Sequence, residues 1–468
     1  MPKRKKKKNT YDPATTLQFM SLSHGLEDLA KNLFELSCAG SRSVWPKMTG
    51  LEDVSGNIES RKKFLTASHA GMSEAQSIII DNLRSGKSIS VSHHVLFRGI
   101  ADAIAWQLIN MQLCYARRFF KGHDQPNIDQ CNFDSVVFAA ESHMSDNPGS
   151  IALISDLTSF VQVGDLLTMS NIGQQGIIEV KEGEKNKEIS DALKFYSESK
   201  CDLFLHLFAE SEGQLTMKQM GRMARQIGRM AHVAEVMSKG VSEDPDKKMM
   251  VYIPDEMIDT ETWYDVLQDT MLASKDRGWA INTIDDSIFI GCYSEEKMRL
   301  AGHIFFNSWF DQCGATPQCP RGSLFSSMIH PLAFPVFNLQ ISNDLKFDTL
   351  FGRIHVCIGF NVEGFLGQCE KSGLEVRFAT NKEATKADQT GIKPYRHKGK
   401  AIFVGDGQSE QLIMDGIFLR AMYHHQRPIN LIKNILLQMR QESPNKLLQE
   451  TQKAAPLISA LDHMGDRT

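Results

Sequence analysis

Two apolar segments near the middle of the chain predict a pair of neighbouring strands. They cover residues 160–170 and 176–183 and are rich in Val, Ile and Leu, which favour strands. Turn residues fill the short stretch between them, so an antiparallel hairpin is the simplest arrangement. Because successive side chains of a strand point to opposite faces, Glu179 and Lys181 share one face of the second strand. Charged groups therefore interrupt strands that are otherwise apolar.

The pairing of the two strands decides whether their charged side chains meet. A register that sets Met169 or Ser170 near Gly176 or Ile177 places Asp165 beside Lys181 or Glu179. An unpaired buried charge costs several kcal/mol or loses its charge through a shifted pKa. Asp165, Glu179 and Lys181 must therefore neutralise one another's charge or bind an ion that neutralises it.

Two carboxylates with a lysine beside them make a recognisable chemical unit. Oxygen ligands on rigid strands suit Mg²⁺ or Mn²⁺, which takes its other ligands from water and substrate phosphates. Such an ion polarises a phosphoryl oxygen and supplies hydroxide, while Lys181 stabilises developing charge or positions the attacking water. This is the chemistry of phosphodiester hydrolysis. Alternatively, Glu179 and Lys181 form a rim pair on a half-exposed strand, and Asp165 is a turn residue after Gly164.

The order of these residues resembles the core of the PD-(D/E)XK nuclease superfamily. Gly-Asp is followed by an apolar strand, a turn, a second apolar strand and Glu-x-Lys, with thirteen residues between Asp165 and Glu179. The resemblance lies within residues 91–255 and implies a restriction-endonuclease-like mixed sheet flanked by helices. It also implies that Asp165 and Glu179 bind the metal and that Lys181 is catalytic. Gly164 stands where the family motif has proline.

Residues 217–237 predict an amphipathic helix after the Glu-x-Lys strand. Its apolar face recurs at the helical period and comprises Met220, Ala224, Ile227, Ala231 and Ala234. A second, polar stripe comprises Gln219, Arg222, Gln226 and Arg229. The resemblance implies that such a helix brings Gln or Arg toward the site, where this stripe would contact nucleic-acid phosphates. A solvated basic face is the alternative.

A further acidic residue is expected on a helix before the core strands, again from the resemblance. Residues 95–109 predict a helix that continues to about Phe120, and Asp102 lies among its apolar residues. Glu141 follows the apolar run 136–140 and is a rival for the same role. Both residues could equally be ordinary surface or capping acids.

The length of 468 residues favours two domains. We expect a basic tail over 1–13, a helical region over 14–90, the nuclease-like domain over 91–255, a C-terminal α/β or α+β domain over 256–441 and a tail over 442–468. Within the nuclease-like domain, the strand after the helix is either 201–208 or 249–253, and 241–248 reads as a loop. Ser73 starts a capped helix. Strands of the last domain are expected at 279–284, 287–291, 353–358, 374–378 and 401–404, with helices at 261–274 and 428–440.

Composition is that of an ordinary globular protein, with 42% hydrophobic and 23% charged residues. No apolar run reaches the roughly eighteen residues of a membrane span, so we expect a cytoplasmic protein without membrane contact. Nine scattered cysteines favour reduced thiols. Without the six basic residues at 3–8, the chain carries 46 basic against 56 acidic residues, so nucleic acid must bind to local basic surface.

The sequence therefore predicts a metal-dependent nuclease that hydrolyses phosphodiester bonds of nucleic acid. DNA is favoured over RNA, and a role in defence against foreign DNA, with a homo-oligomer or a defence-system partner, follows from the family resemblance alone. The alternative is a non-catalytic interaction or nucleic-acid-binding protein that uses a nuclease-like scaffold.

Overall fold

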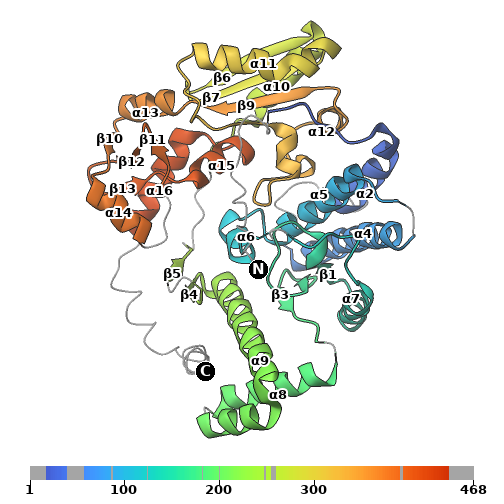
Figure 1. Cartoon of the computed structure of the whole chain (residues 1–468). Coiled ribbons are helices and arrows are strands. Elements are labelled where there is room, and N and C mark those ends of the chain that lie inside the picture. Colours follow the sequence, from blue (N-terminus) through green and yellow to red (C-terminus); the bar gives the residue numbers. More distant parts are fainter. Residues whose placement is uncertain are drawn as a thin grey trace, which may run out of the picture. The chain divides into compact units, whose positions relative to one another are not determined.

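The computed structural model describes residues 17–39, 57–85, 88–123, 125–181, 183–199, 201–246, 249–253, 260–389 and 394–441. They form two compact units. The central unit comprises residues 28–253, and the C-terminal unit comprises residues 260–441 together with residues 17–27. Both units combine helices with small antiparallel sheets, so the predicted mixed α/β class is confirmed (Figure 1). The predicted tails 1–13 and 442–468 lie outside the described residues.

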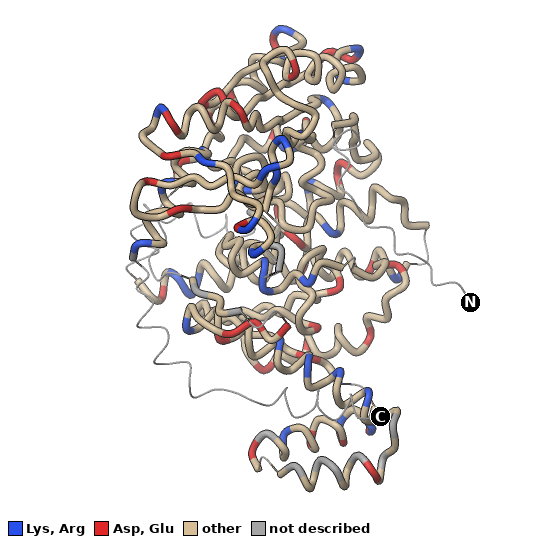
Figure 2. Tube along the Cα trace, turned by 60° about the vertical axis from the view of Figure 1, so that its left-hand side comes forward, with Lys and Arg blue, Asp and Glu red and all other residues tan. Residues whose placement is uncertain are grey.

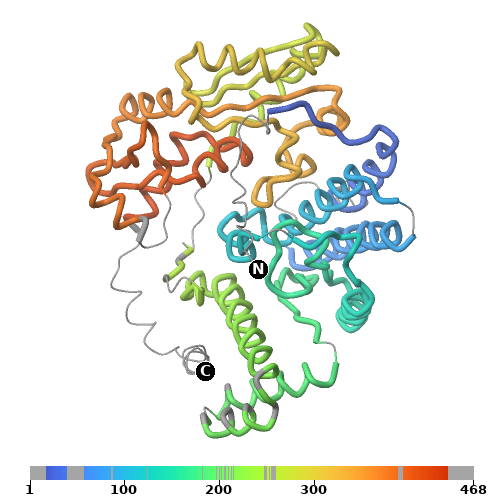
Figure 3. Tube along the Cα trace, viewed as in Figure 1, coloured from blue at the N-terminus to red at the C-terminus, as the bar shows by residue number. Residues whose placement is uncertain are grey.

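Helices make up most of the central unit. They are α2 (Glu27–Ala39), α4 (Ile58–Arg84), α5 (Val91–Leu108), α6 (Leu113–Phe119), α7 (Asp134–Asp146), α8 (Glu184–Ser199) and α9 (Asp202–Lys239). The strands are β1 (Ile151–Ile154), β2 (Leu166–Met169), β3 (Gln175–Ile178), β4 (Val241–Asp244) and β5 (Met249–Tyr252), and the short helix η4 (Ser155–Leu157) follows β1. Figure 3 traces the chain through these elements.

The predicted hairpin is part of a three-stranded antiparallel sheet in the order β1-β2-β3. Every side chain of β1 and β2 is buried. The free edge of β1 is covered by α4, whose Gln76 donates to Ala152 O (3.1 Å) and accepts from Ile154 N–H (2.8 Å). A glutamine side chain thus replaces a neighbouring strand and prevents further edge pairing.

The buried helix α5 is shorter than predicted. It is apolar on nearly all sides, with Phe97, Ile104 and Trp106 fully buried, as expected of a helix at the centre of a core. The prediction that it continues to about Phe120 is wrong, because Asn110 and Met111 adopt left-handed backbone angles (φ 53° and 58°). The chain turns there and resumes as α6.

Helix α9 contains the predicted helix 217–237 but extends far beyond it toward the N-terminus. The strand candidate 201–208 is therefore wrong, whereas 249–253 contains β5, which pairs with β4 in a separate two-stranded sheet. Gly213 has non-helical angles (φ 80°, ψ 169°) and breaks α9 into two segments. The loop predicted over 241–248 begins instead with strand β4.

The buried face of α9 follows the predicted stripe only in part. Met220 and Ala224 pack against α8, but Ile227 is 38% exposed, and Ala231 and Ala234 are also exposed. After Ala224 the helix leaves α8 and packs on α6 and β4, so its buried face rotates. The buried residues of this second part are His232, Val233 and Val236.

The C-terminal unit holds two four-stranded antiparallel sheets. The first has the order β6-β7-β9-β8, and in the second β12 pairs with β10, β11 and β13. The strands are β6 (Trp279–Ile284), β7 (Ile288–Tyr293), β8 (Arg321–Ser323), β9 (His355–Phe360), β10 (Glu375–Phe378), β11 (Arg396–His397), β12 (Lys400–Gly405) and β13 (Glu410–Leu412). All five strands expected here from the sequence are confirmed, with shifts of at most two residues at most boundaries.

The helices of the C-terminal unit are α10 (Tyr264–Arg277), α11 (Glu296–Gln312), α12 (Asn343–Leu350), α13 (Val362–Lys371), α14 (Asn381–Gln389), α15 (Asp415–Tyr423) and α16 (Pro428–Gln441), with short helices η1 (His24–Leu26), η5 (Leu324–Met328) and η6 (Val336–Asn338). Helices α10, α11, α13, α15 and α16 pack against these sheets (Figure 1). Residues 17–27 join this unit because Leu22 N–H donates to Leu350 O (2.8 Å) and Glu27 pairs with Arg353 (3.0 Å). The remainder of the helical region 14–90 belongs to the central unit, and Ser73 lies inside α4 rather than at a helix start.

Candidate functional site

The β2–β3 hairpin brings Asp165 and Glu179 to the same end of the sheet. Leu166 pairs with Ile178, so the next position along sets Asp165 opposite Glu179. The backbone N–H of Asp165 donates to Ile178 O (2.8 Å), and Val180 N–H donates to the Asp165 carboxylate (2.7 Å). The observed register lies outside the predicted range, because Met169 pairs with Gln175, one position from the nearest predicted pairing of Met169 with Gly176.

Gly164, directly before Asp165, occupies a backbone conformation that proline cannot adopt. Its φ of +78° is a conformation that proline, fixed near −65°, cannot adopt. A Cβ atom at this position would lie 2.2 Å from Ile177 Cγ2. Glycine therefore lets the chain pass close to β3 and enter β2 with Asp165 in place.

Glu179, Lys181 and Gln226 form a closed set of hydrogen bonds. Lys181 Nζ donates to Glu179 Oε1 (2.8 Å), and Gln226 Nε2 donates to the same oxygen (2.5 Å). Lys181 Nζ also reaches Gln226 Oε1 (3.4 Å). The other carboxylate oxygen, Glu179 Oε2, is buried and has no hydrogen-bond partner among the described residues. Hydrogen bonds thus fix Oε1 of this carboxylate, and Oε2 remains available to bind a ligand.

The electrostatics of Asp165 reflect a crowded acidic site. Burial, and after it the nearby carboxylates of Glu179 and Asp156, raise the pKa of Asp165 to about 6, against the opposing effects of Val180 N–H and Lys181. Burial also raises the pKa of Asp156, against the influence of Arg98. Partly buried carboxylates that repel one another are typical of sites that bind a cation.

Neither acid proposed from the sequence as an additional member joins this set. Both Asp102 oxygens are used by Ser159, through its N–H (2.7 Å) and its hydroxyl (2.6 Å). Burial raises the pKa of Asp102 to about 7, against those bonds and Arg98. Glu141 lies exposed on α7, and none of the described contacts of Asp165 or Glu179 involves it.

The acid that the structure adds is Asp156 in η4, directly after β1. Sequence reasoning missed it because the apolar run 151–154 was not singled out as a strand. That run of Ile, Ala, Leu and Ile ends at Ser155-Asp156, so a charged residue at the end of a buried strand was the available signal.

The polar stripe of α9 divides among different contacts. Gln226 reaches the site, whereas Gln219 donates to Asn186 of α8 (2.5 Å). Arg229 pairs with Asp246 (2.9 Å), and Arg222 is exposed. Of the four residues, only Gln226 contacts Glu179 or Lys181 in the described structure.

The donor set at the hairpin fits a divalent cation held by few protein ligands. No group of three or more His, Cys, Asp or Glu side chains within the described ranges is arranged to hold a metal ion. Two carboxylates, Asp165 and Glu179, remain, which suffices for Mg²⁺ because this ion keeps waters and takes substrate oxygens. The unpartnered Glu179 Oε2 and the raised pKa of Asp165 are features that a bound cation would relieve.

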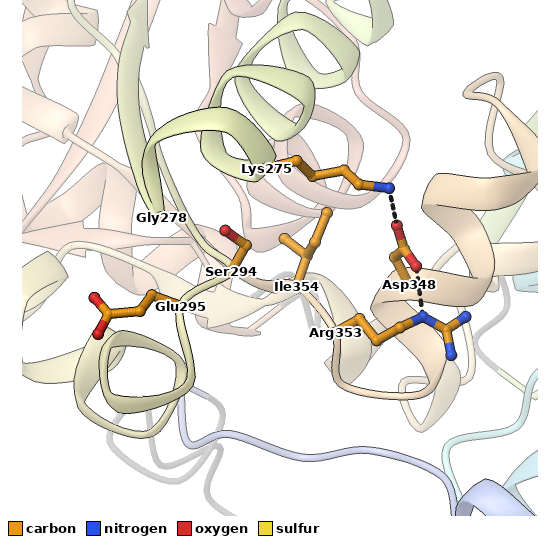
Figure 4. A pocket seen from close by; sticks show the side chains of 7 residues that line it. All are labelled: Lys275, Gly278, Ser294, Glu295, Asp348, Arg353 and Ile354. Atoms are coloured by element: carbon orange, nitrogen blue, oxygen red, sulfur yellow. Dashed lines mark hydrogen bonds and ion pairs between the residues drawn. The ribbon is translucent and has the colours of Figure 1, made fainter.

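A pocket in the C-terminal unit is a weaker candidate (Figure 4). It has a volume of about 370 Å³, and three of its charged groups pair with one another. Asp348 accepts from Lys275 (2.7 Å) and from Arg353 (2.5 Å), which also binds Glu27 (3.0 Å). Lys275, Asp348 and Arg353 point toward one another in Figure 4, and their charges are satisfied without a ligand.

All nine cysteines are free, as the sequence predicted. None of the described helices is both long and apolar enough to span a membrane. Basic and acidic residues are interspersed along the trace (Figure 2). No family model matches this chain, and neither the curated proteins nor the solved structures compared with it contain a match.

Proposed function

We propose that this protein is a metal-dependent nuclease that hydrolyses phosphodiester bonds. Asp165 and Glu179 would bind Mg²⁺ or Mn²⁺, and Lys181 would position the attacking water or stabilise charge on the phosphate. The observation that carries the proposal is the meeting of Asp165, Glu179, Lys181 and Gln226 at one end of the β2–β3 hairpin, with Glu179 Oε2 lacking a partner.

A restriction-endonuclease-like core is part of the proposal. The β1-β2-β3 sheet, followed by a helix that brings Gln226 to Glu179 and Lys181 directly after the end of β3, supports it. This is the arrangement of helix and strands that the family resemblance implies. The fourth strand of the family's mixed sheet is not identified among the described residues, since β4 and β5 pair with each other.

The residues of the site have distinct tasks in this reaction. When bound, the ion would supply Lewis acidity at the phosphoryl oxygen and an activated water. Val180 N–H fixes the Asp165 carboxylate, and Gln226 together with Lys181 fixes Glu179. Asp165 must lose its proton to act as a ligand, so activity should rise as pH passes through about 6.

The proposed substrate is nucleic acid, with DNA favoured over RNA, and the proposed setting is cytoplasmic defence against foreign DNA. These assignments rest on the family resemblance. Arg222 and Arg229 remain proposed contacts to the nucleic acid, because both lie on the same helix as Gln226.

A cleavage assay with purified full-length protein tests the proposal. Single- and double-stranded DNA and RNA are incubated with Mg²⁺, with Mn²⁺ and with chelator. Asp165→Asn, Glu179→Gln and Lys181→Ala should each lower the cleavage rate by orders of magnitude. Glu188→Gln and Lys239→Ala remove the same charges from exposed helical ion pairs and should leave the rate unchanged.

Two outcomes would reject the nuclease assignment. One is cleavage that survives chelation, and the other is full activity in a folded site variant. Nucleic-acid binding without cleavage under any metal would favour the alternative of a non-catalytic scaffold. Circular dichroism of each variant establishes that it is folded.

A further inference from the structure

Three basic residues gather around two aspartates, Asp244 and Asp246, in the central unit. Arg229 of α9 forms a two-pronged ion pair with Asp246, through Nε (2.9 Å to Oδ2) and Nη2 (3.0 Å to Oδ1). Lys121 Nζ lies 3.9 Å from Asp246 Oδ2. Arg118, on the last turn of α6, interacts electrostatically with Lys121 and with Asp244. We call Arg118, Lys121 and Arg229 the basic cluster.

The basic cluster lies next to the candidate metal site. Arg229 is three residues after Gln226, which is about 4.5 Å along the same helix. Lys121 N–H donates to the side chain of Gln162 (2.6 Å), and Gln162 N–H donates to Phe119 O (3.2 Å). Gln162 belongs to the segment that leads directly into Asp165, so two separate connections join the cluster to the site.

The cluster carries more positive than negative charge in a partly buried place. Three cations face two carboxylates, those of Asp244 and Asp246. The Lys121 side chain is only 14% exposed. Burial lowers the pKa of Lys121, and Arg229 and Arg118 lower it further, against the two aspartates. A further anion would offset this excess charge.

A neighbouring polar group also lacks a partner. Arg118 Nε is buried without a hydrogen-bond partner among the described residues. His232, one helical turn beyond Arg229, is 2% exposed and interacts with the backbone of Glu243 and with Asp244, Arg118 and Lys121. An unpartnered buried donor beside an excess of positive charge indicates a place for an oxygen-rich anion.

The contact between Arg229 and Asp246 shows the kind of anion that fits. A guanidinium group binds a carboxylate and a phosphate with the same two-pronged geometry. Asp246 lies in the turn between β4 and β5, is 35% exposed and takes no part in the strand pairing, which ends at Asp244. Its carboxylate can therefore leave Arg229 without breaking the β4–β5 ladder.

We propose that Arg118, Lys121 and Arg229 bind a backbone phosphate of the strand held at the metal site, and that Asp246 occupies this phosphate position in the free protein. This inference rests on the proposed nuclease function. It assigns to the protein a second contact with its substrate, beside the phosphate that is cut, and makes Asp246 a built-in competitor.

Binding measured in the absence of metal tests the inference independently of cleavage. Fluorescence anisotropy follows a labelled oligonucleotide with full-length protein in chelator, over a range of salt concentrations. Lys121→Gln and Arg229→Gln should each weaken binding and lower the slope of log affinity against log salt by about 0.9. Asp246→Asn, which keeps the shape and removes the competing charge, should tighten binding. Lys239→Gln, on the same helix but paired with exposed Glu235, is the matched control.

The outcomes separate this inference from the nuclease proposal. If the lysine and arginine variants keep the wild-type slope, or if Asp246→Asn does not tighten binding, the phosphate assignment is wrong even when the protein cleaves. If both effects appear in an inactive protein, the phosphate site stands and the nuclease proposal fails. Binding of inorganic phosphate, measured by calorimetry, without any binding of oligonucleotide would overturn the assignment to a strand. Lys121→Met removes the charge but fills nearly the same space as lysine. If Lys121→Gln weakens binding only through lost packing, Lys121→Met should bind like the wild type; if the charge matters, both variants should bind equally weakly.

Discussion

Replacing Asp165 by asparagine should stabilise the central unit while it removes the metal ligand. The carboxylate accepts a hydrogen bond from Val180 N–H (2.7 Å), which the amide oxygen of asparagine can also accept. Burial and the nearby Glu179 disfavour the negative charge, as the pKa of about 6 against 3.8 indicates. Asparagine retains the shape and the bond but not the charge.

The size of the gain follows from the pKa shift. A shift of about two units corresponds to about 3 kcal/mol, and screening by solvent at this partly exposed site reduces the estimate to about 1–2 kcal/mol. The folded protein holds the Asp165 proton more tightly than the unfolded chain, so the wild type loses stability as pH rises from 3.8 to about 6. The advantage of Asp165→Asn should therefore be small near pH 4 and complete above pH 7.

Hydrogen exchange followed by mass spectrometry measures the stability of the hairpin in the wild type and in Asp165→Asn. Peptides covering β2 and β3 report the free energy of opening at pH 4.5, 6 and 8, after correction for the intrinsic exchange rate at each pH. Mg²⁺ should stabilise the wild type, by about 2.7 kcal/mol at a hundred times its dissociation constant, and should not stabilise Asp165→Asn. Asp146→Asn, at the exposed end of α7, serves as the control.

Either of two results would refute this reasoning. If Asp165→Asn is no more stable than the wild type at pH 8, the Asp165 charge is not unfavourable in the fold. If it is more stable by the same amount at all three pH values, the gain has another origin. A Mg²⁺ effect of equal size in both proteins would show that the ion binds elsewhere.

Two further predictions concern Gly164 and the C-terminal unit. Gly164→Ala should destabilise the central unit by about 2–4 kcal/mol, because it combines a positive φ with a Cβ 2.2 Å from Ile177 Cγ2. Thermal melting measures this loss of stability. Gly183 also has a positive φ, but a Cβ there would meet no atom within 4 Å, so Gly183→Ala should destabilise the protein less. A chain ending after residue 257, if circular dichroism and a melting curve show that it folds, should retain metal binding or indiscriminate cutting and lose preference among substrates. A folded truncation that keeps the preference of the full chain would show that the C-terminal unit is not the selector.

Strand alternation carried most of the correct predictions. The hairpin around residues 160–183 and five strands of the C-terminal unit follow from apolar residues bounded by turn signals. The meeting of Asp165 with Glu179 was predictable because the turn residues between the two apolar segments imply a short hairpin, which brings the far ends of both strands together. The exact register was missed because strands that are apolar on both faces tolerate a slip, and the length of the turn was not fixed by its composition.

Helical periodicity was less informative where a helix changes its neighbours. The spacing of Met220, Ala224 and Ile227 predicts one straight buried face, but α9 packs first on α8 and then on α6 and β4, which leaves Ile227 exposed. The apolar run 201–208 reads equally as strand or helix, since both bury Leu and Phe. Tertiary contacts decided both cases.

The acids around the site show why composition could not rank them. Asp102 and Asp156 are both charged residues among apolar ones, yet Asp102 is used by the N–H and hydroxyl of Ser159. Only Asp156 acts on Asp165, because the chain turns back after β1. The distinction depends on the contact between Asp102 and Ser159, which are 57 residues apart, and no local sequence pattern contains it.

The difference between Asp102 and Asp165 also bears on the choice between enzyme and scaffold. The burial cost of Asp102 is offset by two hydrogen bonds that hold the segment at Ser159, so this residue has a structural role. Asp165 receives one backbone hydrogen bond and faces two carboxylates that repel it, and Glu179 keeps one oxygen buried without a partner in the described part of the chain. A scaffold needs neither cost, since asparagine and glutamine would fill the same space. A protein that binds a divalent cation, as the proposed nuclease would, needs both charges.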